Sequence, residues 1–97
     1  METISAKELD RYAADGRSMI IDLRSRKEFA AAHVPGALNV PQGRFRGELA
    51  GKQAVPVILY CARGALSMAV ARDLEEKGYQ TKSVVGGFRA YQNRRMW

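Results

Sequence analysis

Short apolar runs alternate along this chain with stretches whose apolar residues recur at helical spacing. Met19–Leu23 and Val57–Tyr60 are nearly continuous apolar runs, which is typical of strands buried on both faces of a parallel sheet. Ala37–Val40 and Thr81–Val85 are weaker strand candidates, and Pro41 ends the first of them. Because helical stretches separate most of these runs, the pattern predicts an α/β domain with helices on both faces of a parallel sheet.

Two of the predicted helices begin at capping boxes. Ser5 and Glu8 are spaced so that the serine hydroxyl and the glutamate carboxylate each accept a hydrogen bond from an unpaired amide. Ser25 and Glu28 repeat this spacing at the start of a second, short helix. We expect the first helix to end at Gly16. Two later helices are predicted over Ser67–Lys77 and Phe88–Arg95.

The segments between these elements carry turn residues. His33–Gly36 predicts a turn after the second helix. Residues 42–54 are interrupted by Gly and Gln, and we expect one helical turn within them, near Arg46–Leu49. Gly78 is expected to end the third helix, and Gly86–Gly87 to form the turn into the last one.

Length and cysteine content limit the classes of protein that this chain can belong to. With 97 residues there is room for one hydrophobic core, so we interpret residues 1–97 as a single domain. Cys61 is the only cysteine, which excludes a disulfide-stabilised scaffold. With His33 as the only histidine, the chain also lacks the ligands of a Cys- and His-rich metal site.

The chain is basic, with a net charge of +6 from 16 Lys and Arg against 10 Asp and Glu residues. Eleven of the 16 cations are Arg, whose guanidinium suits the recognition of oxyanions. The cations form no long block and accompany no nucleic-acid-binding motif. We therefore interpret them as a solvated basic surface with a general attraction for small anions, and expect no nucleic-acid partner.

Nothing in the sequence indicates a membrane or secretory protein. No apolar stretch approaches the length of a membrane span, and the N-terminal segment is polar from its start. We therefore expect no membrane partner and a cytoplasmic protein with a reduced thiol. The sequence leaves open a removed leader or a larger parent protein.

Cys61 is the strongest candidate for chemistry. It directly follows the apolar run Val57–Tyr60 and directly precedes a predicted helix, and sites in open parallel sheets form at the carboxyl ends of strands. Loop amides and the positive end of a helix both stabilise a thiolate. Gly64 allows a close backbone approach, and Arg63 can add a full positive charge. The alternative interpretation is an inert, buried cysteine.

Other catalytic patterns fit the sequence poorly. Gly47–Gln53 superficially resembles a phosphate-binding loop, but it is one residue short and lacks the Ser or Thr that holds Mg²⁺. A papain-type mechanism needs a histidine beside Cys61, and His33 is the one candidate. Since His33 lies in a predicted turn, we expect it to be structural and to hydrogen bond to the backbone.

Three stretches, taken in order, are similar to the signatures of one known family. Asp22–Phe29 contains Asp-x-Arg-x-x-x-Glu-Phe, and His33–Pro41 contains His-Val-Pro-Gly-Ala-x-Asn-x-Pro. Val57–Gly64, followed at a distance by Gly86–Gly87, is similar to the active-site half of the same family. Over Ile4–Tyr91 the chain resembles the rhodanese-like family of sulfurtransferases.

The chain departs from this family at informative positions. Many single-domain members have Cys-x-x-Gly-x-Arg-Ser, whereas here Leu66 replaces the Arg and Ser67 is retained. Tyr91 stands where the family often has Trp. The six-residue loop Cys61–Leu66 resembles that of sulfurtransferases, and related phosphatases need an Arg where this chain has Ser67. Phosphatase and arsenate reductase activities are therefore not expected.

The resemblance implies a fold, a reaction and a set of site residues. The fold is a three-layer α/β/α domain with a central, mostly parallel five-stranded sheet. In the implied reaction, the Cys61 thiolate takes a sulfane sulfur from thiosulfate or from a polysulfide or persulfide, and the resulting persulfide passes it to cyanide, a thiol or a protein acceptor. No metal or organic cofactor is implied. The implied substrate-binding residues are Ala62, Arg63, Gly64, Ala65, Leu66 and Ser67.

Three further residues are expected to support the site. Asp22 and Arg24 are expected to pair with each other or with the backbone, and so to hold the ends of neighbouring strands. Glu28 is expected to act chiefly as a helix cap and also to lie near the pocket. Two other functions remain open: a non-catalytic interaction or regulatory module of the same fold, and a sulfur carrier for a dedicated protein partner.

Overall fold

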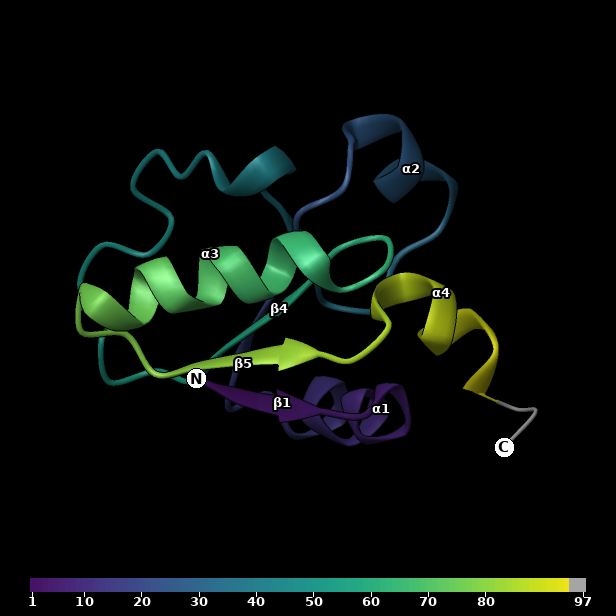
Figure 1. Cartoon of the computed structure of the whole chain (residues 1–97), viewed down its shortest axis with the longest axis horizontal. Helices are drawn as coiled ribbons and strands as arrows, with labels where there is room; N and C mark the ends of the chain where they lie inside the picture. The colour runs from purple at the N-terminus through teal and green to yellow at the C-terminus, as the bar shows by residue number, and fades with distance from the viewer. Residues whose placement is uncertain (95–97) are drawn as a thin grey trace.

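Five short strands form one sheet in the computed structural model, which describes residues 1–94 (Figure 1). The strand order is β1-β5-β4-β2-β3, and every pairing is parallel. The strand β4, which precedes Cys61, is therefore the central strand, and β2 lies directly beside it. The strands are β1 (Glu2–Ile4), β2 (Met19–Asp22), β3 (Leu38–Asn39), β4 (Val57–Tyr60) and β5 (Thr81–Val84).

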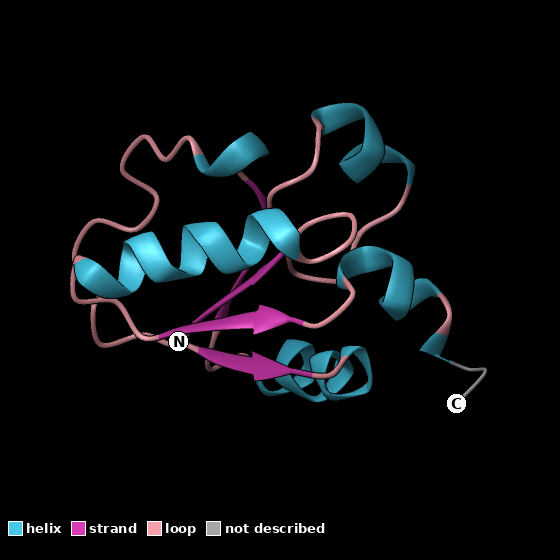
Figure 2. Ribbon diagram, in the orientation of Figure 1, coloured by secondary structure: helices cyan, strands magenta, loops and turns pink. Residues whose placement is uncertain are grey.

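Helices cover both faces of this sheet, which confirms the three-layer α/β/α architecture (Figure 2). The α1 and α4 helices share one hydrophobic cluster and contact each other, whereas α3 belongs to the cluster on the opposite face. The short α2 lies beyond the carboxyl end of β2. The helices are α1 (Ala6–Asp15), α2 (Arg26–Ala31), α3 (Ala65–Glu76) and α4 (Gly87–Gln92).

The alternation of side chains along β4 divides the core in two. Ile58 and Tyr60 belong to the cluster under α1 and α4, whereas Val57 and Leu59 belong to the cluster under α3. All four residues are fully buried, which confirms the prediction of a strand with two covered faces. Cys61 follows on the α3 side and belongs to that cluster.

The predicted caps are present. In both α1 and α2 the N-cap serine accepts a hydrogen bond from the amide three residues later, and the glutamate carboxylate accepts one from the serine amide. Gly16 ends α1 in the left-handed conformation. These local signals set the helix boundaries because they satisfy amides that have no partner within the helix.

The structure differs from the predicted elements at the edges of the sheet. β1 carried no sequence signal, because it has three residues and buries only Ile4; its pairing with β5 makes it a strand. The strand expected over Ala37–Val40 is reduced to two residues. The α3 helix begins at Ala65, two residues earlier than predicted, because Gly64 serves as its N-cap.

Two other predictions need correction. The helical turn expected near Arg46–Leu49 is instead a non-helical turn, and the short 3₁₀ turn of this segment lies at Pro41–Gly43. The α4 helix ends at Gln92 rather than continuing to Arg95, and Arg95 itself lies outside the described residues.

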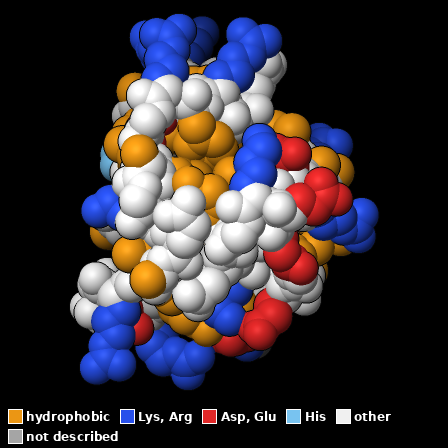
Figure 3. All heavy atoms as spheres, turned by 90° about the vertical axis from the view of Figure 1, so that its left-hand side faces the viewer, with side chains coloured by type: hydrophobic (Ala, Val, Ile, Leu, Met, Phe, Trp, Pro, Cys, Tyr) orange, Lys and Arg blue, Asp and Glu red, His pale blue; other side chains and the backbone are white. Residues whose placement is uncertain are grey.

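Charged side chains are spread over the surface. On the end of the molecule where the strands begin, Lys and Arg side chains stand at several separate places, and acidic side chains gather on one side (Figure 3). At this end of the molecule, the arrangement fits the interpretation of a solvated basic surface rather than one basic patch. Within residues 1–94, no helix combines the length and the apolar character that a membrane span requires.

Candidate active site

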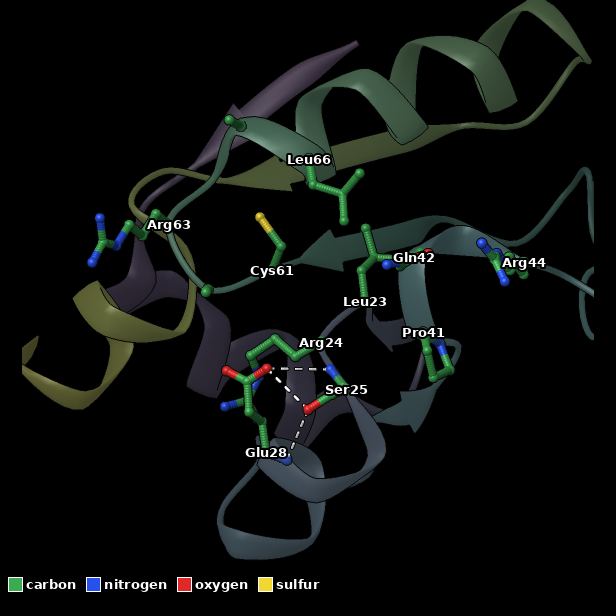
Figure 4. A pocket seen from close by; sticks show the side chains of 12 residues that line it. Leu23, Arg24, Ser25, Glu28, Pro41, Gln42, Arg44, Cys61, Arg63 and Leu66 are labelled. Atoms are coloured by element: carbon green, nitrogen blue, oxygen red, sulfur yellow. Dashed lines mark hydrogen bonds between the residues drawn. The ribbon is translucent and has the colours of Figure 1, made fainter.

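A pocket of about 660 Å³ opens at the carboxyl end of the sheet, beside Cys61 (Figure 4). Its walls come from the segment after β2, the 3₁₀ turn at Pro41–Gly43 and the loop between β4 and α3. A volume of this size suits a small organic ligand. The pocket is lined by Leu23, Arg24, Ser25, Glu28, Pro41, Gln42, Arg44, Cys61, Ala62, Arg63, Ala65 and Leu66.

Backbone amides surround the sulfur of Cys61. Sγ accepts hydrogen bonds from the amides of Gly64 at 3.1 Å and Ser67 at 3.4 Å, at the N-terminal end of α3. Burial raises the pKa of the Cys61 thiol, but these hydrogen bonds outweigh it, so that the pKa lies below its ordinary value. The site therefore favours a thiolate, which is the nucleophilic form of cysteine.

Hydrogen bonds from two sides hold the loop in this shape. On the α3 side, the buried Ser67 hydroxyl donates to the carbonyl of Gly64 at 3.0 Å and also contacts the hydroxyl of Ser83 at 2.7 Å. On the α4 side, the amide of Phe88 donates to the carbonyl of Cys61 at 2.8 Å. Because both contacts join the loop to neighbouring elements, the amides around the sulfur are positioned before any ligand binds.

Gly87 is the point of closest approach between α4 and the loop. A Cβ atom at Gly87 would overlap the carbonyl oxygen of Cys61 and lie 2.8 Å from the nitrogen of Arg63, and its φ is +60°. Only glycine allows both the conformation and the contact. The Gly86–Gly87 pair therefore does more than form the predicted turn, since it lets the loop rest directly on the start of α4.

We predict that Gly87→Ala destabilises the fold by about 2–4 kcal/mol and raises the pKa of Cys61, because the backbone of the loop must move away. Gly16→Ala is the matched control: its φ is +67°, but a Cβ there meets nothing within 4 Å. We expect the control to cost only about 1 kcal/mol. Urea unfolding and the pH dependence of thiol alkylation measure both effects, and equal losses in the two variants would contradict the prediction.

A buried ion pair at the end of β2 is linked by a hydrogen bond to the end of β4. Asp22 is fully buried, and its carboxylate accepts hydrogen bonds from the Arg24 guanidinium at 2.8 Å and the Tyr60 hydroxyl at 2.6 Å. The Tyr60 hydroxyl also accepts a hydrogen bond from the amide of Val34. Burial and the bond to Asp22 raise the pKa of Tyr60, which keeps it neutral. The expected pairing of Asp22 with Arg24 is confirmed.

Arg24 also lines the pocket and makes two further contacts. Its guanidinium donates to the carbonyl of Ala32 at 2.6 Å and lies 3.9 Å from the centre of the Phe88 ring. Glu28 caps α2 as expected and also lines the pocket, as predicted. The contacts with Tyr60 and Phe88 were missed, because both residues resemble ordinary core residues in the sequence.

Arg63 and Leu66, which both line the pocket, point in different directions relative to the Cys61 sulfur. The guanidinium of Arg63 points away from the Cys61 sulfur, whereas Leu66 stands beside the pocket (Figure 4). The backbone amide of Arg63 helps to lower the pKa of Cys61. Gln42 and Arg44 line the pocket as well and were not singled out, since no local pattern marks the 3₁₀ turn as part of the site.

His33 has the structural role that was expected. Its Nδ1 lies 2.7 Å from the carbonyl oxygen of Phe29, and its ring stacks on the Phe29 ring. It does not line the pocket that contains Cys61. In the described part of the chain, no three His, Cys, Asp or Glu side chains are grouped to hold a metal ion.

Known proteins are similar to this chain in sequence. A tRNA sulfurtransferase of Desulfurococcus amylolyticus is 36% identical over 86 residues, which are 89% of this chain and 17% of that protein. A human thiosulfate:glutathione sulfurtransferase is 42% identical over 60 residues, which are 62% of this chain and 52% of that protein. The chain thus spans about a sixth of the first relative and about half of the second. Both relatives are named as sulfurtransferases.

Solved structures and the family model agree with these relatives. The Staphylococcus saprophyticus protein SSP1007 superimposes with a TM-score of 0.82 at 28% identity, over 94% of this chain and 93% of that one. The model of the Rhodanese-like domain matches residues 5–94, which is nearly the whole chain. The sequence, the parallel sheet and the position of Cys61 at the end of its central strand agree with this match, and the chain belongs to the rhodanese-like family.

Proposed function

We propose that this chain is a sulfurtransferase that carries a sulfane sulfur on Cys61 as a persulfide. The observation that supports this most directly is the set of amides around Sγ, beside a pocket that Cys61 helps to line. The same amides that favour a thiolate also favour the negative charge of a Cys–S–S⁻ group. A purely structural cysteine would need neither the amides nor the pocket.

The proposed reaction has two half-reactions. With thiosulfate as donor, the Cys61 thiolate attacks the outer sulfur, a new S–S bond forms, and sulfite leaves with the electrons of the bond that breaks. With a persulfide donor, a thiolate leaves instead. A second thiophile, such as cyanide or a cellular thiol, then attacks the outer sulfur of the Cys61 persulfide and regenerates the thiolate, which makes the mechanism ping-pong.

The names of the relatives extend this proposal to the substrates. A pocket of about 660 Å³ has room for thiosulfate as donor and for a glutathione-like thiol as acceptor, the two substrates in the name of the human relative. A protein acceptor remains the alternative if the chain acts as a sulfur carrier. No step in either version requires a metal or an organic cofactor.

The experiment that tests the proposal is intact mass spectrometry of the reduced protein after incubation with a sulfur donor. We expect a gain of one sulfur atom that a reductant or cyanide reverses, located on Cys61 by peptide mapping. A protein that gains no sulfur from thiosulfate, a thiosulfonate or polysulfide is a non-catalytic module, and the proposal is then wrong. A protein that gains sulfur but passes it to no small acceptor is a carrier.

Arg63 is proposed to attract anionic donors from the rim of the pocket without touching the sulfur. We predict that Arg63→Ala lowers kcat/KM for thiosulfate by no more than about fivefold, since an exposed charge contributes about 0.2–1 kcal/mol. The pH midpoint of Cys61 alkylation should stay below that of a free thiol, because the Ala variant keeps the amide of residue 63. Stopped-flow alkylation measures the pH midpoint, and steady-state kinetics at two salt concentrations measure kcat/KM for thiosulfate. A large upward shift of the midpoint would show that the guanidinium stabilises the thiolate directly.

A further inference from the structure

The wall of the pocket beside Cys61 is apolar. Leu23 and Leu66 stand next to the Cys61 side chain in the close view (Figure 4). Ala62 and Ala65 line the same pocket. Leu66 is 39% exposed, although burying a leucine is favourable, so its apolar surface is available to a ligand.

No positive side chain among the pocket residues is free to meet an anion at the sulfur. Arg24 is occupied by Asp22, by the carbonyl of Ala32 and by the Phe88 ring. Arg63 points away from the sulfur, and Arg44 lies on the far side of Gln42 (Figure 4).

The one acidic side chain in the lining of the pocket acts on Arg24 as well. The carboxylate of Glu28 accepts hydrogen bonds from the amide and hydroxyl of Ser25, and its negative charge, together with that of Asp22, raises the pKa of Arg24. Arg63 can attract a small dianion to the rim of the pocket, but at the sulfur itself only the loop amides are placed to receive it (Figure 4). Thiosulfate is such a dianion, with no apolar part that the leucines could contact.

We propose that Leu66 makes this site selective for sulfur donors whose sulfane sulfur is attached to an organic group, in preference to inorganic thiosulfate. The proposal rests on the proposed sulfur transfer at Cys61 and names its donor class: organic thiosulfonates and organic persulfides. The organic group packs against Leu66 and Leu23 while the outer sulfur reaches Sγ. An apolar contact of this kind strengthens binding without requiring a counter-charge.

The loading step balances for this donor class. The Cys61 thiolate attacks the outer sulfur of R–SO₂–S⁻, the bond between the two sulfur atoms of the donor breaks, and the sulfinate R–SO₂⁻ leaves with its electrons. Two negative charges enter and two remain, one on the sulfinate and one on the Cys61 persulfide. No oxidant or reductant takes part.

The test compares benzenethiosulfonate with thiosulfate, using cyanide as the common acceptor. In a ping-pong mechanism kcat/KM for the donor reports on the loading step alone, so the ratio of the two values measures donor selectivity. We expect Leu66→Arg to raise kcat/KM for thiosulfate and to lower the benzenethiosulfonate-to-thiosulfate ratio by about tenfold or more, the effect of one added charge-assisted contact. Leu66→Gln should lower kcat/KM for benzenethiosulfonate by about threefold or more, through lost apolar contact, without a gain for thiosulfate.

Met68→Arg is the matched control. Met68 lies on the same helix and is 36% exposed, but it does not line the pocket. The control adds the same charge two residues away, and its ratio should stay within about twofold of the parent value, as expected for an exposed charge. Equal ratios in Leu66→Arg and Met68→Arg would overturn the donor assignment. If no donor loads sulfur onto Cys61 in any variant, the proposed function itself fails, which the mass measurement separates from a change in selectivity.

Discussion

Replacing Cys61 by Ser is expected to leave the fold intact and to abolish sulfur transfer. The side chain changes by one atom, and a hydroxyl oxygen can still accept the hydrogen bonds that the amides of Gly64 and Ser67 donate to Sγ. The change in the free energy of unfolding should therefore be within about 1 kcal/mol. Sulfur transfer should be lost, because a serine hydroxyl is a far weaker nucleophile at neutral pH and cannot form a persulfide.

The measurement combines urea unfolding, donor kinetics and intact mass. We expect Cys61→Ser to unfold at nearly the parent urea concentration, to gain no sulfur from any donor and to turn over at the background rate. Cys61 is the only cysteine, so no other thiol can take its place. Turnover by the Ser variant above one hundredth of the parent rate would mean that the sulfur passes directly from donor to acceptor, without a protein persulfide.

Much of this site could be predicted from the sequence, because its signals are local. Cys61 directly follows the most apolar strand and directly precedes a helix, which fixes its place at the edge of the sheet. Asp22 and Arg24, which pair with each other, lie within three residues of the chain. The spacing of Ser25 and Glu28 is that of a capping box, so it predicts the hydrogen bonds between them. Each of these features depends on neighbours in the chain, so a pattern of residue types is enough to find it.

The remaining features of the site and of the sheet depend on contacts between segments that are distant in the sequence. No pattern of residue types specifies such contacts. The 3₁₀ turn that brings Gln42 into the pocket wall is fixed by the amide of Gln42 donating to the carbonyl of Leu23 at 2.9 Å. The direction of the Arg63 side chain follows from the course of the whole loop (Figure 4). The strand β1 exists only because β5 pairs with it. The proposed donor selectivity depends on such contacts, whereas the proposal that Cys61 is the nucleophile follows from its place in the chain.

Asp22 is expected to be the most sensitive position for stability. Its carboxylate is fully buried and forms an ion pair with the guanidinium of Arg24, whose side chain is itself only 7% exposed. The amide of Arg24 and the hydroxyl of Tyr60 donate to the same carboxylate. Removing it leaves a buried cation without its counter-charge, a buried hydroxyl without its acceptor and the ends of β2 and β4 without this link.

We predict that Asp22→Ala lowers the free energy of unfolding by about 3–5 kcal/mol, the cost of breaking a buried ion pair from one side. This is a large part of the roughly 5–15 kcal/mol that holds a typical domain folded. Asp73→Ala is the matched control, because it removes an ion pair with Lys77 in which both side chains are at least 60% exposed, and it should cost no more than about 0.5 kcal/mol. Urea unfolding of the parent protein, Asp22→Ala and Asp73→Ala measures the free energy of unfolding of each. An Asp22→Ala variant as stable as Asp73→Ala would mean that water or a neighbouring group replaces the carboxylate.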